Sequence, residues 1–270
     1  MNNRVTFTPE KIIQKTETRP PFVLLFSPNG HGKTTFIASI GSSFIIDTED
    51  KCNEVEGAYR YVPETFADII ASLEYVLASE KVPFRALVID TLDWLEKRVH
   101  EEICGTYTYF DKKSNLWENA KTIIDDNCKD LNFGKGNSLA ANMVLAGILP
   151  VMEAIRKKHN IPIILCAQQA KIPVKEPDKD EYKVIDLRLE PKLASAISDK
   201  VEAKLYIQRR YNKDYKGAMI PTKERYLITE PQKGIAAKNS LHLPDEITIG
   251  EHTGWSDFVS AINTNKTPRS

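Results

Sequence analysis

The sequence has no net charge and few cysteines. Because 37 Lys and Arg residues balance 37 Asp and Glu residues, no overall positive field favours nucleic acid, and any DNA site would have to be a local patch. The four cysteines are far apart and lack the CxxC spacing of zinc and redox sites, so we expect reduced and mostly buried thiols. They are Cys52, Cys104, Cys128 and Cys166.

The sequence also lacks a long uninterrupted apolar run and an apolar leader. The polar amino terminus has no core of a secretory signal, which predicts a cytoplasmic protein. The longest apolar stretch, Leu139 to Ile155, is interrupted by Asn142 and Pro150 and is shorter than the roughly 20 residues that a membrane span needs. We therefore expect a buried helix there and no membrane partner.

Short apolar runs alternate with helical patterns along most of the chain. Runs such as Phe22 to Phe26 are typical of strands buried on both faces. This alternation predicts an α/β fold with a mostly parallel central sheet flanked by helices. We expect a single domain over residues 1–263 and a disordered polar tail at 264–270. The expected strands are 22–26, 44–46, 86–89 and 161–166, and the expected helices are 33–40, 65–79 and 145–159.

Three segments are less regular. Residues 101–142 are predicted to be an insertion of uncertain helix content, and residues 171–180, which contain Pro173 and Pro177, are predicted to be an exposed mobile loop. The alternating patterns of 203–208 and 225–229 predict a C-terminal antiparallel hairpin with a long tip at about 212–221.

The segment Ser27-Pro28-Asn29-Gly30-His31-Gly32-Lys33-Thr34-Thr35 is the strongest functional signal. A Gly-rich turn between a strand and a helix allows backbone N–H groups to converge on phosphates. We expect Lys33 to bind the outer phosphates and Thr34 to bind Mg²⁺, although Ser27 replaces the usual first glycine. His31 is given no chemistry of its own. The predicted nucleotide-binding residues are Asn29, Gly30, His31, Gly32, Lys33, Thr34 and Thr35.

Acidic residues follow two of the expected strands. Asp90 ends the strand at 86–89, where P-loop proteins place an acid that holds Mg²⁺. Hydrolysis further needs a carboxylate that orients or deprotonates water, and Glu49 is the leading candidate. The alternative is that Glu49 is a solvated loop acid. Asp47 and Asp50 rank below it as candidates for the base.

Gln168 ends the fourth expected strand. Its amide could contact the γ-phosphate or the attacking water and report the nucleotide state to the loop that follows. Gln169 is a close rival, and an ordinary polar strand end is the alternative interpretation.

Basic residues gather between residues 200 and 240. Ten basic residues face four acidic ones there, and Tyr206, Tyr211, Tyr215 and Tyr226 lie among them. Basic groups with stacking faces suit single-stranded DNA, but a solvated hairpin with aromatics on its buried face is an equal alternative. The basic residues are Lys200, Lys204, Arg209, Arg210, Lys213, Lys216, Lys223, Arg225, Lys233 and Lys238.

The order of these motifs resembles the RecA-like ATPases. It is most similar to phage-encoded AAA-type nucleotide-binding proteins, which include RecA/Rad51-like single-strand annealing proteins. The resemblance covers about residues 22–249. It rests on Gly30 to Thr35, Phe44 to Glu49, Leu87 to Leu92, Phe133 to Gly136, Ile161 to Gln168, Ala237 to Ser240 and Leu243-Pro244.

The resemblance implies a RecA-like P-loop NTPase core, with the strand of Gln168 between the phosphate-loop strand and the strand of Asp90, and with catalytic roles for Glu49, Lys33 and Gln168. It also implies ATP and Mg²⁺ as cofactors, and a DNA-contacting loop at 171–183. The DNA-binding candidates are Lys171, Lys175, Arg209, Arg210 and Lys213.

The resemblance further implies a homo-oligomer with ATP at a subunit boundary. Lys238 is the candidate that acts in trans, and Ser240 stands where related ATPases often have an arginine. Loss of that arginine predicts slow hydrolysis, because such a group contributes orders of magnitude in rate.

The leading hypothesis is therefore an ATPase that binds single-stranded DNA and promotes annealing or recombination. Its expected setting is the cytoplasm of a bacterial host, with phage recombination or single-strand-binding proteins as partners. An oligomeric nucleotide-dependent switch or motor acting on a protein is the alternative. A small-molecule kinase is less favoured, because the sequence has no clear lid or acceptor-site signature.

Overall fold

A computed structural model describes residues 19–175, 180–232 and 234–264. The expected tail at 264–270 lies, except for Thr264, outside the described residues. The helices are α1 (Lys33–Ala38), α2 (Phe66–Ala78), α3 (Leu92–Thr106), α4 (Lys135–Asn142), the π-helix η2 (Met143–Ile148), α5 (Leu149–His159), α6 (Pro191–Lys200) and α7 (Gly254–Thr264).

The strands build one large sheet and one small hairpin. They are β1 (Phe22–Ser27), β2 (Phe44–Asp47), β3 (Tyr59–Tyr61), β4 (Leu87–Asp90), β5 (Thr108–Asp111), β6 (Leu116–Asn119), β7 (Ile163–Val174), β8 (Tyr182–Leu187), β9 (Ala203–Lys213), β10 (Met219–Ile228), β11 (Lys238–Asn239) and β12 (Glu246–Ile249).

The central part of the large sheet is parallel. Its strand order is β12-β10-β9-β1-β7-β4-β2-β3, and all pairs from β9 to β3 are parallel. Antiparallel pairing is confined to β10, β11 and β12 at one side and to β8, which pairs with β7. The predicted order is confirmed, since β7 lies between β1 and β4. The protein therefore has a RecA-like α/β core.

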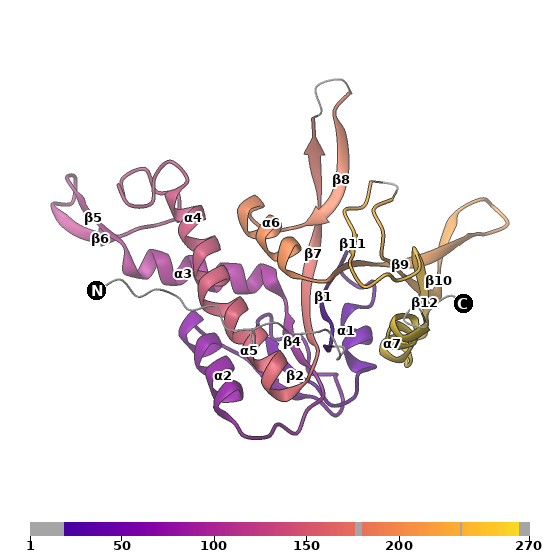
Figure 1. Ribbon diagram of the computed structural model, residues 1–270. Helices are drawn as coiled ribbons and strands as arrows, with labels where there is room; N and C mark the ends of the chain where they lie inside the picture. Colours follow the sequence, from indigo (N-terminus) through magenta and orange to yellow (C-terminus); the bar gives the residue numbers. More distant parts are fainter. Residues whose placement is uncertain (1–18, 176–179, 233, 265–270) are drawn as a thin grey trace, which may run out of the picture.

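Helices cover both faces of this sheet (Figure 1). Phe22, Leu24 and Phe26 of β1 pack in a core with α2, α3, α5 and α6, whereas Val23 and Leu25 pack against α1 and α7. Because successive side chains of a strand point to opposite faces, a strand buried on both sides must be apolar throughout. This explains why β1 reads as a continuous apolar run.

The helix predicted at 145–159 is longer than expected. The segments α4, η2 and α5 follow one another without a break, so that the helix runs from Lys135 to His159 and is, over the described residues, the one helix long and apolar enough to cross a membrane by length and composition. The expectation that this stretch is too short was therefore wrong. Its core-facing side chains, such as Val144, Met152 and Ile155, are buried against the protein.

The segment at 101–142 contains three structured parts. It comprises the end of α3, the β5–β6 hairpin and the whole of α4, and it extends away from the large sheet (Figure 1). Gly136 lies so close to Ile123 that a Cβ at position 136 would be 1.6 Å from the Ile123 carbonyl oxygen. A glycine is therefore required where α4 packs against the loop that precedes it.

The predicted C-terminal antiparallel hairpin is confirmed as β9 and β10, and two hairpins extend further than the sequence analysis expected. Strand β7 continues to Val174 and pairs with β8. The prediction of a loop was therefore wrong for residues 171–174, which form a strand. Strands β9 and β10 extend to Lys213 and from Met219, which leaves a short tip instead of the long one expected at 212–221. Both hairpins project from the body of the protein (Figure 1). In each hairpin, the polar outer halves of its two strands pair with one another and not with the rest of the sheet.

Candidate nucleotide-binding site

The strand register places the ends of four strands side by side. Ser27 of β1 lies opposite Gln168 of β7, and Asp47 of β2 lies opposite Asp90 of β4. Ligands of open parallel sheets bind at the carboxyl ends of the strands. The residues chosen from the sequence are therefore collected at the edge where a ligand is expected.

The loop after β1 has the backbone of a phosphate-binding loop. Gly30 and Gly32 have φ values of 74° and 111°, which L side chains rarely adopt. The Lys33 amine donates to the carbonyl oxygen of Ser27 at 3.1 Å and to Oε1 of Gln168 at 3.1 Å. Burial lowers the pKa of Lys33, while Cys166, Asp90 and nearby acids oppose that shift. The Ser27 side chain accepts from the Lys33 amine at 3.3 Å, so the residue that replaces glycine contributes to the arrangement.

Asp90 is a buried carboxylate that, with Lys33 and Gln168, lines a cavity at these strand ends. Burial raises its pKa to about 6, although the hydrogen bond from the Cys52 thiol at 3.2 Å and the charge of Lys33 act in the opposite direction. Burial therefore destabilises the charged form of this carboxylate. A cation bound beside Asp90 would stabilise the charged form.

The three acids that follow the second expected strand have different surroundings. Asp47 accepts from the backbone of Lys51 and Cys52 and from Nε of Arg60 at 2.7 Å, so its oxygens hold the loop after β2. The exposed Asp50 pairs with Arg60. Glu49 and Asp47 both line the cavity, and the Glu49 side chain is 8% exposed. Arg60 pairs with Asp47 and Asp50 but not with Glu49, so Glu49 stays the leading candidate and its role as the base stays a prediction.

Two contacts hold the Glu49 carboxylate. Its Oε1 accepts from the Thr91 hydroxyl at 3.1 Å, and its Oε2 lies 2.9 Å from the Lys51 amine. The hydrogen bond to Glu49 raises the pKa of Lys51. Thr91 and Lys51 also line the cavity, and sequence reasoning missed both, although each is within two residues of a predicted acid.

The two glutamines at the end of the apolar part of β7 point in different directions. Gln168 contacts the phosphate-loop lysine and lines the cavity, whereas Oε1 of Gln169 accepts from the Tyr206 hydroxyl at 2.8 Å. The Gln168 backbone N–H donates to Asp93 at 2.8 Å, and Asp93 pairs with Arg188 just after β8. Gln168 therefore connects the cavity to the base of the β7–β8 hairpin.

A cavity of about 500 Å³ contains most of the predicted nucleotide-binding and catalytic residues. The lining residues are Asn29, Gly30, Gly32, Lys33, Thr34, Thr35, Asp47, Glu49, Lys51, Asp90, Thr91, Gln168, Arg209 and Arg225. His31 of the same loop is partly buried, with Nδ1 unpaired, and burial lowers its pKa, with the charges of Arg209, Lys33 and Arg225 adding to the effect.

The donors in this cavity fit Mg²⁺ bound together with phosphates. Thr34 offers a hydroxyl and Asp90 a carboxylate, and Mg²⁺ is typically held by one or two carboxylates, waters and substrate phosphates. Within the described part of the chain, no group of three or more His, Cys, Asp or Glu side chains could hold a metal alone. The fit is therefore to a shared metal and not to a protein cage.

The basic residues of 200–240 do not form one surface. Lys204 is buried in an ion pair with Asp186, and the Lys238 amine donates to the Ser198 and Asp199 carbonyls at 2.9 Å, at the end of α6. Arg209, a DNA-binding candidate, lines the cavity. The exposed DNA-binding candidates are Lys171, Lys175, Arg210 and Lys213.

Arg225 was also missed as a site residue. The sequence analysis counted it only as a charge, although the alternation along β9 and β10 indicates the face of the hairpin on which it lies. Leu205, Ile207 and Leu227 face α1, and residues two apart on a strand share a face. Arg209 and Arg225 therefore point to the side on which the phosphate loop enters α1.

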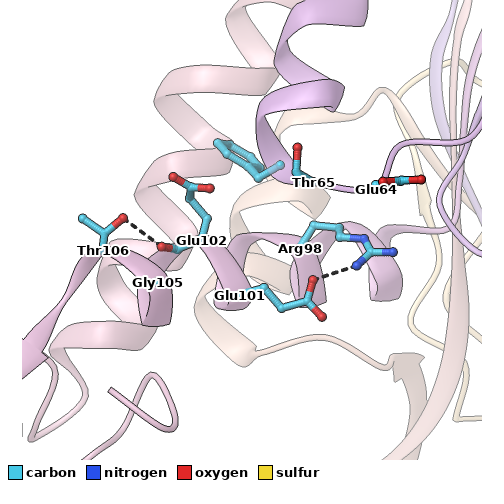
Figure 2. A pocket seen from close by; sticks show the side chains of 8 residues that line it. Glu64, Thr65, Arg98, Glu101, Glu102, Gly105 and Thr106 are labelled. Carbon is cyan, nitrogen blue, oxygen red and sulfur yellow. Dashed lines mark hydrogen bonds and ion pairs between the residues drawn. The ribbon is translucent and has the colours of Figure 1, made fainter. Parts of the chain in front are cut away.

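A second cavity is of a different kind. It has a volume of about 350 Å³ and lies between the start of α2 and the last turns of α3, where Glu64, Glu101 and Glu102 contribute carboxylates (Figure 2). Arg98 points toward Glu101 and donates to it at 2.8 Å. This acidic lining is unsuited to phosphate, so the cavity at the strand ends is the candidate site.

The fold and the loop define a P-loop nucleotide-binding protein with a RecA-like core. Residues 19–241 match the AAA domain family, and the chain belongs to that family. No curated protein matches the sequence. Among solved structures, the chain is similar to the RadB recombinase, with a TM-score of 0.42 and 14% identity over 87% of this chain and 90% of that chain. A similarity at this level carries no argument about function.

We predict that Asp90→Asn stabilises the nucleotide-free protein. The carboxyl pKa rises from 3.8 to about 6 on folding, so the unfolded chain releases this proton first and stability falls as pH increases between these values. The variant should gain up to about 3 kcal/mol above pH 6, at about 1.4 kcal/mol per unit, and almost nothing near pH 4. Urea unfolding at both pH values measures this gain. Equal or lower stability at pH 8 would contradict the burial argument.

Proposed function

We propose that this protein binds ATP with Mg²⁺, hydrolyses it slowly and binds single-stranded DNA to promote annealing or recombination. The observation that carries the nucleotide part is the single cavity that holds the phosphate loop, Asp90, Glu49 and Gln168. The DNA part and a phage setting are supported by the resemblance of the motif order and by the two projecting hairpins.

The proposed reaction assigns one role to each side chain. Lys33 exchanges its contacts with Ser27 and Gln168 for phosphate oxygens, which brings a buried cation to the transferred group. Thr34 and Asp90 hold Mg²⁺, which neutralises charge on the phosphates when bound. Glu49 orients the attacking water and accepts its proton, while the Thr91 hydroxyl fixes the carboxylate.

We expect Glu49→Gln to abolish turnover while ATP still binds. The change keeps the size of the side chain and the contact with Thr91 but removes the base, so the rate should fall by about 100-fold or more. Phosphate release measures turnover, and calorimetry measures binding. Asp50→Asn is the matched control, because Asp50 is an exposed neighbour that pairs with Arg60. Turnover that survives in the first variant and disappears in the second would show that Asp50 is the base.

The β7–β8 hairpin is a candidate for coupling between nucleotide and DNA. The Arg188 N–H donates to the Gln168 carbonyl at 2.9 Å, and its side chain pairs with Asp93. A shift of Gln168 toward a bound phosphate would therefore act on the base of this hairpin. Lys171 and Lys175 on it are exposed, and part of its tip (176–179) lies outside the described residues.

The β9–β10 hairpin offers a second contact for a single strand. Tyr215 at its tip is 91% exposed, and the Lys216 amine lies 5.4 Å from the centre of that ring. Lys213 is exposed nearby. An exposed aromatic face beside ammonium groups suits a base stacked next to a phosphate.

We predict that oligonucleotide affinity falls with salt. The log–log slope should be about −0.7 for each neutralised phosphate on a single strand. Lys213→Ala with Lys216→Ala should make this slope shallower by about 1.4 if each lysine neutralises one phosphate, and should weaken binding at low salt. Fluorescence anisotropy with a labelled oligonucleotide, with and without ATP, measures both quantities.

The control is Lys112→Ala with Lys113→Ala, which removes two exposed lysines from the turn of the β5–β6 hairpin. This variant should leave the slope unchanged. A slope near zero in the unaltered protein would exclude a phosphate contact and favour a protein partner for the hairpins.

We further propose that the protein assembles with copies of itself so that Lys238 reaches a neighbour's nucleotide. The Lys238 amine would have to leave the α6 carbonyls to do so. If it does, mixing Lys238→Ala with Lys33→Ala should restore activity that each variant lacks, because each supplies the half-site that the other has lost. ATPase assays at several mixing ratios test this, with thermal unfolding as a check on α6. If Lys238→Ala hydrolyses ATP normally and mixtures show no recovery, Lys238 only caps α6.

A further inference from the structure

Two arginines of the β9–β10 hairpin lie side by side above the phosphate loop. Arg209 and Arg225 are directly opposite in the antiparallel register, so their side chains share a face, and both line the cavity. Strand β9 runs parallel to β1 with Tyr206 opposite Phe26. Arg209, three residues further, therefore lies beyond the end of β1, where the loop begins.

Arg225 packs directly against the phosphate loop. A Cβ on Gly32 would lie 2.7 Å from Nε and 2.8 Å from Cδ of Arg225. The absence of a side chain at position 32 therefore allows this guanidinium to approach the backbone that is expected to hold phosphate. The positive φ of Gly32 is one reason for a glycine here, and the contact with Arg225 is a second.

No acidic side chain in the described part of the chain forms an ion pair with Arg225. The residue is 8% exposed, its Nε is buried without a hydrogen-bond partner, and the Nε of Arg209 is in the same condition. By contrast, buried Arg156 pairs with Glu202 at 2.7 Å, and buried Lys204 pairs with Asp186. Arg210, next in the chain, faces outward to Glu224 and Glu246.

This arrangement is unfavourable unless an anion binds. A buried charge without a partner is costly, and like charges directly opposite on two strands repel each other. Guanidinium groups match phosphate oxygens through paired N–H donors. The same cavity contains Lys33 and the phosphate loop, so the anion that satisfies the two arginines would be the outer part of the same triphosphate.

We propose that Arg225, assisted by Arg209, binds the terminal phosphate of ATP within the same subunit. This inference rests on the proposed binding of ATP and deepens it. The two arginines would supply in cis the cation that Ser240 does not supply in trans. Because both arginines belong to the β9–β10 hairpin, binding of a terminal phosphate would also help to fix the position of that hairpin relative to the phosphate loop.

The test compares ATP, ADP and inorganic triphosphate binding to Arg225→Ala, Arg225→Lys and Arg209→Ala. Arg225→Ala should weaken ATP and triphosphate by about 10- to 100-fold, as expected for loss of a charge-assisted bidentate contact, and ADP by less than about threefold. Arg225→Lys should recover part of the loss, because it keeps the charge without the paired donors. The control is Arg85→Ala, which removes an exposed arginine just before the start of β4 and should leave the ATP-to-ADP ratio unchanged.

Thermal unfolding distinguishes this role from simple packing. Without nucleotide, Arg225→Ala should melt at the same temperature as the unaltered protein or higher, since an unpaired buried charge is removed, and its ATP-induced shift should shrink. A lower melting temperature with an unchanged ATP-to-ADP ratio would overturn the proposal. If Arg225→Ala does not fold, Arg209→Ala carries the same comparison, and an unchanged ratio there overturns it.

The failure of this inference is distinguishable from failure of the proposed function. If the unaltered protein binds neither ATP nor triphosphate, nucleotide binding itself is wrong, and this inference falls with it. If the unaltered protein binds ATP more tightly than ADP and all three arginine variants keep that preference, only the arginine contact is wrong.

Discussion

The parallel register of β2, β4, β7 and β1 is the constraint on which the rest of the site depends. Backbone hydrogen bonds fix Asp47 beside Asp90 and Ser27 beside Gln168. A slip of one residue would turn every side chain of a strand to the opposite face, and both faces of β1 are filled with core residues. The same packing that stabilises the core therefore aligns the groups at the strand ends.

The parts of the fold that sequence could predict are those with a local signal. The apolar runs of β1, β2 and β4 and the glycines of the phosphate loop each indicate their structure within a few residues. Hairpin lengths could not be predicted in this way. The outer half of β7, with Lys171 and Pro173, is as polar as a loop, and it is a strand because it pairs with β8.

Candidate residues of the site could be predicted where a local motif or a strand end marks them. Lys33 belongs to the phosphate-loop motif and begins α1, whereas Asp90, Glu49 and Gln168 follow apolar strand segments. Arg225 was missed because its role depends on the position of β10 two strands away from β1, which local pattern does not reveal. The count of local charges overstated the basic surface of residues 200–240. Lys204 forms an ion pair with Asp186, and Lys238 donates to carbonyls at the end of α6.

The cavity contains two charged groups that lack an ion-pair partner among the described residues, one acidic and one basic. The Asp90 carboxyl is destabilised by burial on one side, and Arg225 lacks a partner on the other. The fold does not join them to each other, although a direct ion pair would relieve both. A metal-bound triphosphate carries charges of both signs, with the cation suited to Asp90 and the phosphates suited to Arg225 and Lys33. The strain in these two groups would then be released by one ligand, and binding would stabilise the folded protein by mass action.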